Sequence, residues 1–195
     1  MESKPTVATP SMAYESMRDY WFKISTVLAG TQAMRDAGQK MAPRHERESV
    51  ANYRSRLQGN VLFNVTDLTL RTWVGKPFSA DIQYDKDFPE FIKPWLDDIN
   101  LEGDNLSVFA RQWFSTGVAK AFCHVLVDFP RIEKEGRTAR DDMEENIRPY
   151  CVMVDPERLF FATHMRIGSE EVLTHARIME EVVTVEGWAE VVTEQ

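Results

Sequence analysis

The chain changes from a helical to a strand pattern within one segment, NLSVFARQWFSTGVAKAFCHVLVDFP at residues 105–130. The first half is amphipathic, and Asp104 or Asn105 can cap the helix, which we expect to end at Gly117. The second half is a continuous apolar run closed by a proline, which is typical of a strand buried on both faces, and we place that strand at residues 121–128. The apolar stripe of the helix consists of Leu106, Phe109, Ala110, Trp113 and Phe114.

Three more helices are predicted before this segment. The first runs from about Met12 to Leu28, because apolar residues recur at three- and four-residue steps, with Ser11 as its cap and Gly30 as its stop. The sequence HERES at residues 45–49 opens the second. The third covers residues 60–75, mostly buried and ended by a glycine.

The stretch between the third helix and residue 105 carries weaker signals. Residues 78–84 suggest a short extended piece, and Pro89 fits the first turn of a short helix that Pro94 shortens or bends. Residues 1–130 are therefore expected to form one helix-rich region that includes the strand at 121–128.

The remaining sequence is different in character. Residues 131–148 carry eleven charges and almost no apolar side chains, so we expect a charged surface loop. Residues 149–195 are expected to be a β-rich continuation, in which a turn at 155–158 separates consecutive strands. We place these strands at 150–154, 159–161, 172–183 and 188–192. The predicted fold class is α+β, with a helical N-terminal portion packed on a mixed β region.

Composition excludes several classes of protein. With 43% hydrophobic and 28% charged residues, the 195-residue chain is expected to be globular and not disordered. No apolar run approaches the roughly 20 residues needed to cross a bilayer, and the first residues lack a secretory leader, so we expect synthesis in the cytoplasm and no membrane partner. Cys123 and Cys151 lie in apolar runs and are expected to be free thiols.

Charge is unevenly distributed along the chain. The net charge is −8, which argues against nucleic-acid binding over the whole surface. Residues 35–56 nevertheless hold six bases and three acids, whereas residues 170–195 hold seven acids and one base. The basic stretch could contact DNA or a neighbouring acidic subunit, and a solvated helix face explains it equally well. The candidate contact residues are Arg35, Lys40, Arg44, Arg47, Arg54 and Arg56.

The sequence contains no catalytic constellation. Its four histidines show no metal-binding spacing, and the Gly-Lys pair at 75–76 lacks the other residues of a phosphate loop. A metal-dependent nuclease would require Asp128 to converge with Glu133 or His124 on a cation, which we do not expect. The sequence thus predicts no enzyme, no cofactor and no metal site.

A set of short motifs extends over nearly the whole chain. In the first half they are Trp21, Gly30, Arg35, Ala37-Gly38, Pro43, Glu48, Tyr53, Arg56-Leu57, Phe63-Asn64, Thr69 and Gly75-Lys76-Pro77-Phe78. In the second half they are the segment 101–130 with its Val127-Asp128-Phe129-Pro130 end, Arg148-Pro149-Tyr150 and Asp155-Pro156-Glu157. In order and approximate spacing these motifs resemble those of the portal proteins of tailed bacteriophages, in particular a branch known only as an uncharacterised phage domain.

This resemblance implies a structural subunit of the portal, the head-tail connector ring through which DNA is packaged and ejected. The family's rings contain about twelve copies, and the chain would be an N-terminal part that forms mainly the outer wing, with the stem and clip absent. The implied partners are further copies of the chain, the terminase, capsid and head-completion proteins, and DNA passing through the ring. The implied location is the capsid vertex of the virion, after assembly in the host cytoplasm.

The sequence departs from the family pattern at two places. Lys40-Met41-Ala42-Pro43 stands where the family usually shows Tyr-Leu-Pro, and Phe160 and Phe161 stand where it shows Trp-Arg. Both changes are local, so the expected fold is unaffected. The alternative function is a different head-associated adaptor or scaffold that shares the packing and has no ring-channel role.

Overall fold

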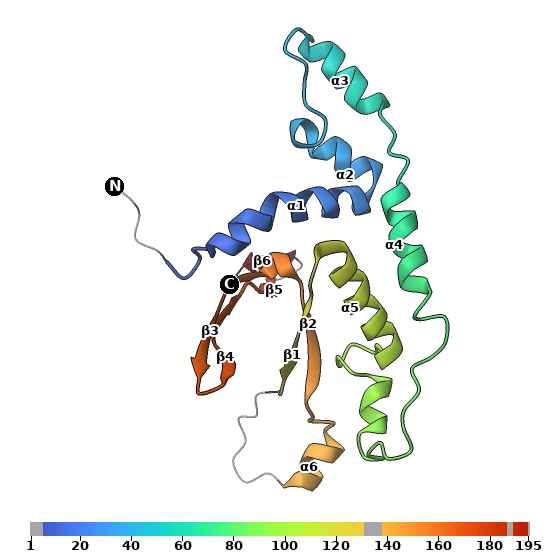
Figure 1. Cartoon of the computed structure of the whole chain (residues 1–195), viewed down its shortest axis with the longest axis vertical. Helices are drawn as coiled ribbons and strands as arrows, with labels where there is room; N and C mark the ends of the chain where they lie inside the picture. The colour runs from blue at the N-terminus through green and yellow to red at the C-terminus, as the bar shows by residue number, and fades with distance from the viewer. Residues whose placement is uncertain (1–5, 131–137, 187–188, 195) are drawn as a thin grey trace. The chain divides into compact units, whose positions relative to one another are not determined.

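A computed structural model describes residues 6–130, 138–186 and 189–194. The chain forms two compact units, residues 1–72 with 156–195 and residues 73–155 (Figure 1). Helices dominate up to residue 120, and short antiparallel sheets follow. The fold class is α+β, as predicted.

The first unit begins with a series of helices whose starts are set by polar caps. The Ser11 side chain accepts a hydrogen bond from the Tyr14 backbone at the start of the first helix, and the Ser49 side chain does the same for Asn52. Gly30 ends the first helix with φ +90°, a backbone angle that suits glycine, and the next helix begins at once. The elements are α1 (Met12–Ala29), α2 (Thr31–Asp36), η1 (Gly38–Lys40), α3 (Val50–Gly59) and α4 (Val65–Gly75), the last of which continues into the second unit.

The start of α4 corrects a prediction. We expected a mostly buried helix over residues 60–75, but α4 begins at Val65 because the Asn64 side chain accepts a hydrogen bond from the Asp67 backbone. Only Val74 of this helix is buried, and Leu68 and Trp73 are each 61% exposed. The short α2 was not predicted.

The first unit also contains the end of the described chain. Its elements there are η3 (Pro156–Arg158), β3 (Leu159–Ile167), β4 (Glu170–Ile178), β5 (Glu181–Glu186) and β6 (Ala189–Glu194). β3 pairs antiparallel with β4, and β5 pairs antiparallel with β6. The strand predicted over 172–183 is therefore two strands, which separate where the Met179 backbone N–H donates to the Arg158 carbonyl at 2.8 Å. The predicted strand at 159–161 extends to residue 167, and Trp188, at the start of the last predicted strand, lies outside the described residues.

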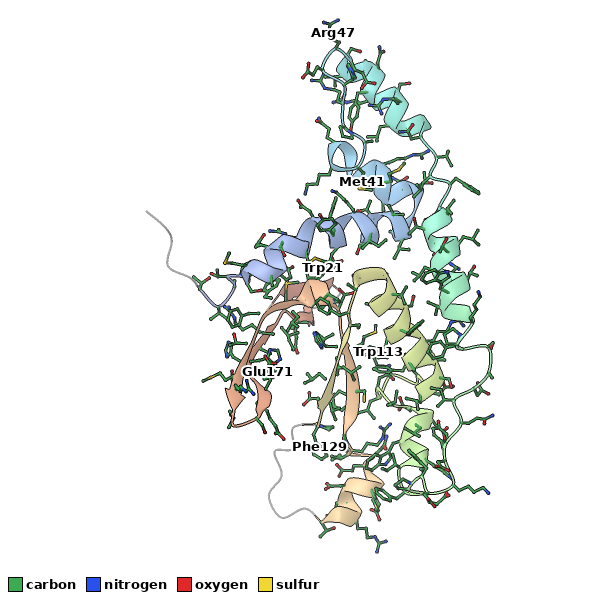
Figure 2. The ribbon with its side chains drawn as sticks, viewed as in Figure 1. Trp21, Met41, Arg47, Trp113, Phe129 and Glu171 are labelled. Atoms are coloured by element: carbon green, nitrogen blue, oxygen red, sulfur yellow. The ribbon has the colours of Figure 1, made fainter. Side chains whose placement is uncertain are left out.

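Aromatic packing joins the two parts of the first unit. Trp21 of α1 is 3% exposed, and its ring meets that of Tyr14 edge to face at 5.4 Å between centroids (Figure 2). Tyr14 in turn meets Phe160 of β3 at 5.1 Å, and the Ser11 backbone donates to the Phe160 carbonyl at 2.9 Å. The Tyr14 hydroxyl donates to the Glu157 carbonyl at 2.9 Å. This aromatic cluster and its hydrogen bonds thus hold together the start of α1 and the start of β3, which are far apart in the sequence.

The second unit combines one long helix with a two-stranded sheet. α5 (Leu106–Lys120) begins at the Asn105 cap, as predicted, but it continues past Gly117 and ends at Ala121, which adopts a left-handed conformation. β1 (His124–Asp128) pairs antiparallel with β2 (Tyr150–Val154). The Trp113 indole of α5 donates to the Cys123 carbonyl at 2.8 Å, which ties the helix to the start of the sheet. The predicted short helix near Pro89 is instead a 3-10 helix, η2 (Lys93–Asp97), with Pro94 in its first turn.

β1 is not the doubly buried strand that we expected at 121–128. Each of its five residues is exposed, and Val127 is 65% exposed. A continuous apolar run indicates that a strand has two apolar faces, but it does not specify what covers them. In the part of the chain that the structure describes, β1 pairs with one strand, so its apolar faces stay open.

The charged segment 131–148 is not simply a loop. Residues 131–137 lie outside the described residues, but α6 (Ala139–Glu144) follows them. The Thr138 side chain accepts from the Asp141 backbone, and the Asp141 side chain accepts from the Thr138 backbone, which makes a capping box. This capping box stabilises a short helix in a segment that has no apolar face. No described helix has the length and apolar character needed to cross a membrane.

Candidate functional site

The candidate site lies where the chain enters α3, in the first unit. Residues 45–48 form a tight turn, in which the Glu48 backbone N–H donates to the His45 carbonyl at 3.0 Å. The His45 backbone N–H donates back to the Glu48 carboxylate at 3.3 Å. Ser49 then caps α3. The turn brings side chains that are adjacent in sequence to one place in front of the helix.

These residues surround an open hollow of about 660 Å³. We call it the basic hollow, because arginine is its commonest lining residue. Its lining consists of Pro43, Arg44, His45, Arg47, Glu48 and Arg56. Three arginines and one glutamate leave two formal positive charges when His45 is neutral, in a chain whose net charge is −8.

Arg56 is held in a fixed orientation by Glu48. Its Nε donates to Glu48 Oε1 and its Nη2 to Glu48 Oε2, both at 2.9 Å, so the pair is bidentate. Nη2 also donates to the Pro43 carbonyl at 3.1 Å, and the guanidinium lies 5.4 Å from the centre of the Tyr53 ring. The hydrogen bonds from Arg56 lower the pKa of Glu48 and reciprocally raise the pKa of Arg56. The pair is therefore ionised at neutral pH and breaks only as pH falls through the lowered pKa of Glu48.

Two further arginines complete the hollow. Arg44 donates from Nη1 to the Glu48 carbonyl at 2.7 Å. Glu48 therefore orients two guanidinium groups, that of Arg56 through its carboxylate and that of Arg44 through its backbone carbonyl. Arg47 is exposed, and its side chain points out from the turn (Figure 2). A site with this donor set can bind an anion through charge-assisted hydrogen bonds.

The other predicted contact residues are not gathered here. Arg35 donates from Nε and Nη2 to the Asn60 carbonyl at 3.0 and 2.8 Å, which ties α2 to the segment before α4. The Lys40 ammonium lies 4.8 Å from the ring centre of Phe22 on α1. Arg54 is exposed on α3 and does not line the hollow. Three of the six predicted residues thus share one site, and three lie elsewhere.

The organising residue, Glu48, was not among the predicted site residues. Arg56 follows it by eight positions, and Glu48 precedes the helix, so rules for neighbours on one helix face do not connect them. Its signals in the sequence were its position inside a basic run and its place among the short motifs of the first half of the chain. Its role depends on the turn at residues 45–48, which only the structure shows.

The described residues considered for a nuclease, Asp128 and His124, are not part of a cluster of possible metal ligands. No group of three or more possible ligands is close enough to hold a metal ion among the residues that the structure describes. Asp128 accepts a hydrogen bond from the Tyr150 hydroxyl at 3.0 Å, and the His124 ring lies against Phe122. Glu133 lies outside the described residues.

The two cysteines are free, half-buried thiols. Burial raises the pKa of Cys123 to about 11, and the nearby Asp155 carboxylate adds to the effect. Burial also raises the pKa of Cys151. The nucleophilic form of a cysteine is its thiolate, so a raised pKa lowers the reactive fraction at a given pH.

We therefore expect Cys123 to react with iodoacetamide at pH 8 roughly tenfold to a hundredfold more slowly in the folded chain than in denaturant. Peptide mass spectrometry over a time course would measure the rate at each cysteine separately. Equal rates at Cys123 with and without denaturant would contradict the buried, protonated thiol.

Comparison with known proteins adds no identity. No protein-family model matches the chain, and no curated protein matches it significantly.

Proposed function

We propose that this chain is a structural subunit of a tailed-phage portal ring, the head-tail connector through which DNA is packaged and ejected, and not an enzyme. Its partners are further copies of itself, the terminase, and capsid and head-completion proteins. It acts at the capsid vertex of the virion. The proposal begins from the sequence motifs that resemble those of portal proteins.

The observation that carries the proposal is the position of those motif residues in the fold. Trp21 and Tyr53 are among the few buried hydrophobic side chains of the first unit. Glu48 and Arg56 make its bidentate ion pair, and Pro156 is fully buried. These motif residues contribute to the packing and the ion pairing of the first unit.

Two further motif positions support the same conclusion. The Asn64 side chain donates to the Val27 carbonyl at 2.6 Å, which links the start of α4 to the end of α1. Gly38 has φ +54° and lies against the Tyr53 hydroxyl, which would be 3.7 Å from an added Cβ. Asn64 and Gly38 therefore lie where a side-chain hydrogen bond links two helices or where the backbone needs a positive φ.

The second unit has the kind of surface that a subunit of an assembly uses. Val127 is 65% and Phe129 is 46% exposed at the end of β1, where Figure 2 labels Phe129. On β2, Val152 is 38% exposed. A two-stranded sheet is marginally stable alone, so apolar side chains on it favour burial against a partner.

Native mass spectrometry of the purified chain, over a range of protein and salt concentrations, tests the proposal. We expect discrete oligomers whose mass approaches about twelve copies, because a cyclic interface closes at a fixed number. Electron microscopy of the same sample should show rings with a central opening, whereas an adaptor or scaffold would form none. A strict monomer under every condition would contradict the proposal that this chain contains ring contacts.

A further inference from the structure

We propose that the basic hollow in front of α3 binds the phosphate backbone of a nucleic acid, without preference for its sequence. This inference goes beyond the portal proposal, because a single chain contains the whole site. It rests on the lining residues of the hollow, on the contacts that orient them and on the local charge.

The arginines of the hollow are oriented before any ligand arrives. Glu48 and the Pro43 carbonyl fix Arg56, and the Glu48 carbonyl fixes Arg44. A guanidinium that is already held loses little side-chain entropy on binding, and its planar fork matches the oxygens of a phosphate. Arg47 adds a third guanidinium, exposed and directed outward (Figure 2).

The lining favours a ligand that is recognised by its charge. Pro43 is the one apolar residue of the six, and the other five carry charged or polar groups, three of them guanidinium groups. His45 carries the one aromatic ring among the six, and Phe, Tyr and Trp are not among them. The three arginines are cationic donors of the kind that contact phosphate oxygens.

The open shape of the hollow suits a polymer more than a single small anion. Its volume of about 660 Å³ exceeds the space of one phosphate group, and it faces solvent at an exposed turn. Successive phosphates along a backbone could occupy it together. Acidic side chains of a second copy are a different occupant with similar charge, and the experiment separates the two.

The affinity is expected to be modest, because the net positive charge of the hollow is small and that of the chain is −8. Neutralising two to three phosphates gives a dissociation constant near the weak end of the roughly 1–100 µM range of non-specific binding at physiological salt. Raising the salt concentration from about 50 to 200 mM should weaken binding roughly tenfold to fortyfold. Two DNA duplexes of unrelated sequence should bind equally.

The test is fluorescence anisotropy with the full chain and a labelled DNA duplex of about 20 base pairs. We expect the double variant Arg44→Gln/Arg47→Gln to weaken binding at least tenfold and to reduce the salt dependence by about two phosphate contacts. Arg54→Gln is the control, since it removes one arginine of α3 outside the hollow, whereas Arg44 and Arg47 precede that helix and line the hollow. It should change the affinity by less than about threefold.

Three kinds of result would overturn the inference. The first kind is a DNA assay in which the unaltered chain does not bind at about 50 mM salt, or in which the double variant binds as the unaltered chain does. Another is full competition by millimolar inorganic phosphate at constant ionic strength, which would indicate a site for one free anion. The third is loss of self-association in the double variant with DNA binding unchanged, which would assign the hollow to a second copy. Circular dichroism of each variant confirms that these exposed substitutions leave the fold intact.

Discussion

Replacing Trp21 by alanine is expected to lower the free energy of unfolding of the first unit by about 3–4 kcal/mol. Trp21 is 3% exposed, so the substitution removes a large buried side chain and leaves a cavity. It also removes the edge-to-face contact with Tyr14, whose ring packs on Phe160. The loss should therefore loosen α1 from β3. Urea denaturation followed by circular dichroism would measure the change in free energy.

Tyr20→Ala is the matched control for this prediction. Tyr20 is the neighbouring aromatic residue on α1 and is 65% exposed, so its removal should cost less than about 1 kcal/mol. Hydrogen exchange at the α1 amides should rise in the Trp21 variant and stay unchanged in the control. Similar losses of stability in both variants would show that the aromatic cluster does not hold the unit together.

The second large effect is expected for Arg148→Met, which should destabilise the second unit by about 2–3 kcal/mol. Arg148 is 5% exposed at the start of β2. Its Nη2 donates to the Asp98 carbonyl and lies 3.4 Å from the Asp98 carboxylate, and its Nε donates to Asn146 at 3.2 Å. These contacts hold the loop before α5 against the strand. The expected loss of stability is smaller than for a fully buried ion pair, because the Asp98 side chain is 35% exposed.

Arg140→Met provides the comparison on a solvent-exposed ion pair. The Arg140 side chain is 85% exposed and bonds Glu144 at 2.9 Å on α6, an arrangement worth about 0–0.5 kcal/mol. Urea denaturation of the two variants measures the difference. Arg148→Lys should lose less stability than Arg148→Met, since lysine keeps the positive charge but lacks the planar guanidinium that donates in several directions. Equal stability of the Arg148 and Arg140 variants would contradict the structural role of Arg148.

The sequence predicted part of the candidate site. The excess of bases at residues 35–56 was visible from composition, and three of the six predicted residues, Arg44, Arg47 and Arg56, do line one hollow. The sequence could not separate them from Arg35, which serves the Asn60 carbonyl instead. Charge along a chain indicates that a basic surface exists, but the turn that precedes α3 decides which side chains share it.

Local structure was the most predictable part of the fold. Ser11 and Asn105 cap their helices as expected, and the turn at 155–158 separates strands as expected, because caps and turns depend on residues within a few positions of one another. The predicted start of α4 was wrong by five residues, since the Asn64 side chain caps the helix and α4 begins at Val65. The α+β class followed from the change of apolar period near residue 121, which is also a local property.

Burial and pairing were decided by the tertiary structure. The apolar run at 121–128 has the composition of a strand covered on two sides, yet β1 pairs only with β2 within the described chain and remains exposed. Tyr14, which packs on Trp21, meets Phe160 across more than 130 positions, which no local pattern encodes. Periodicity is set by neighbours in the sequence, whereas what covers an apolar face or orients an arginine is set by segments that only folding brings together.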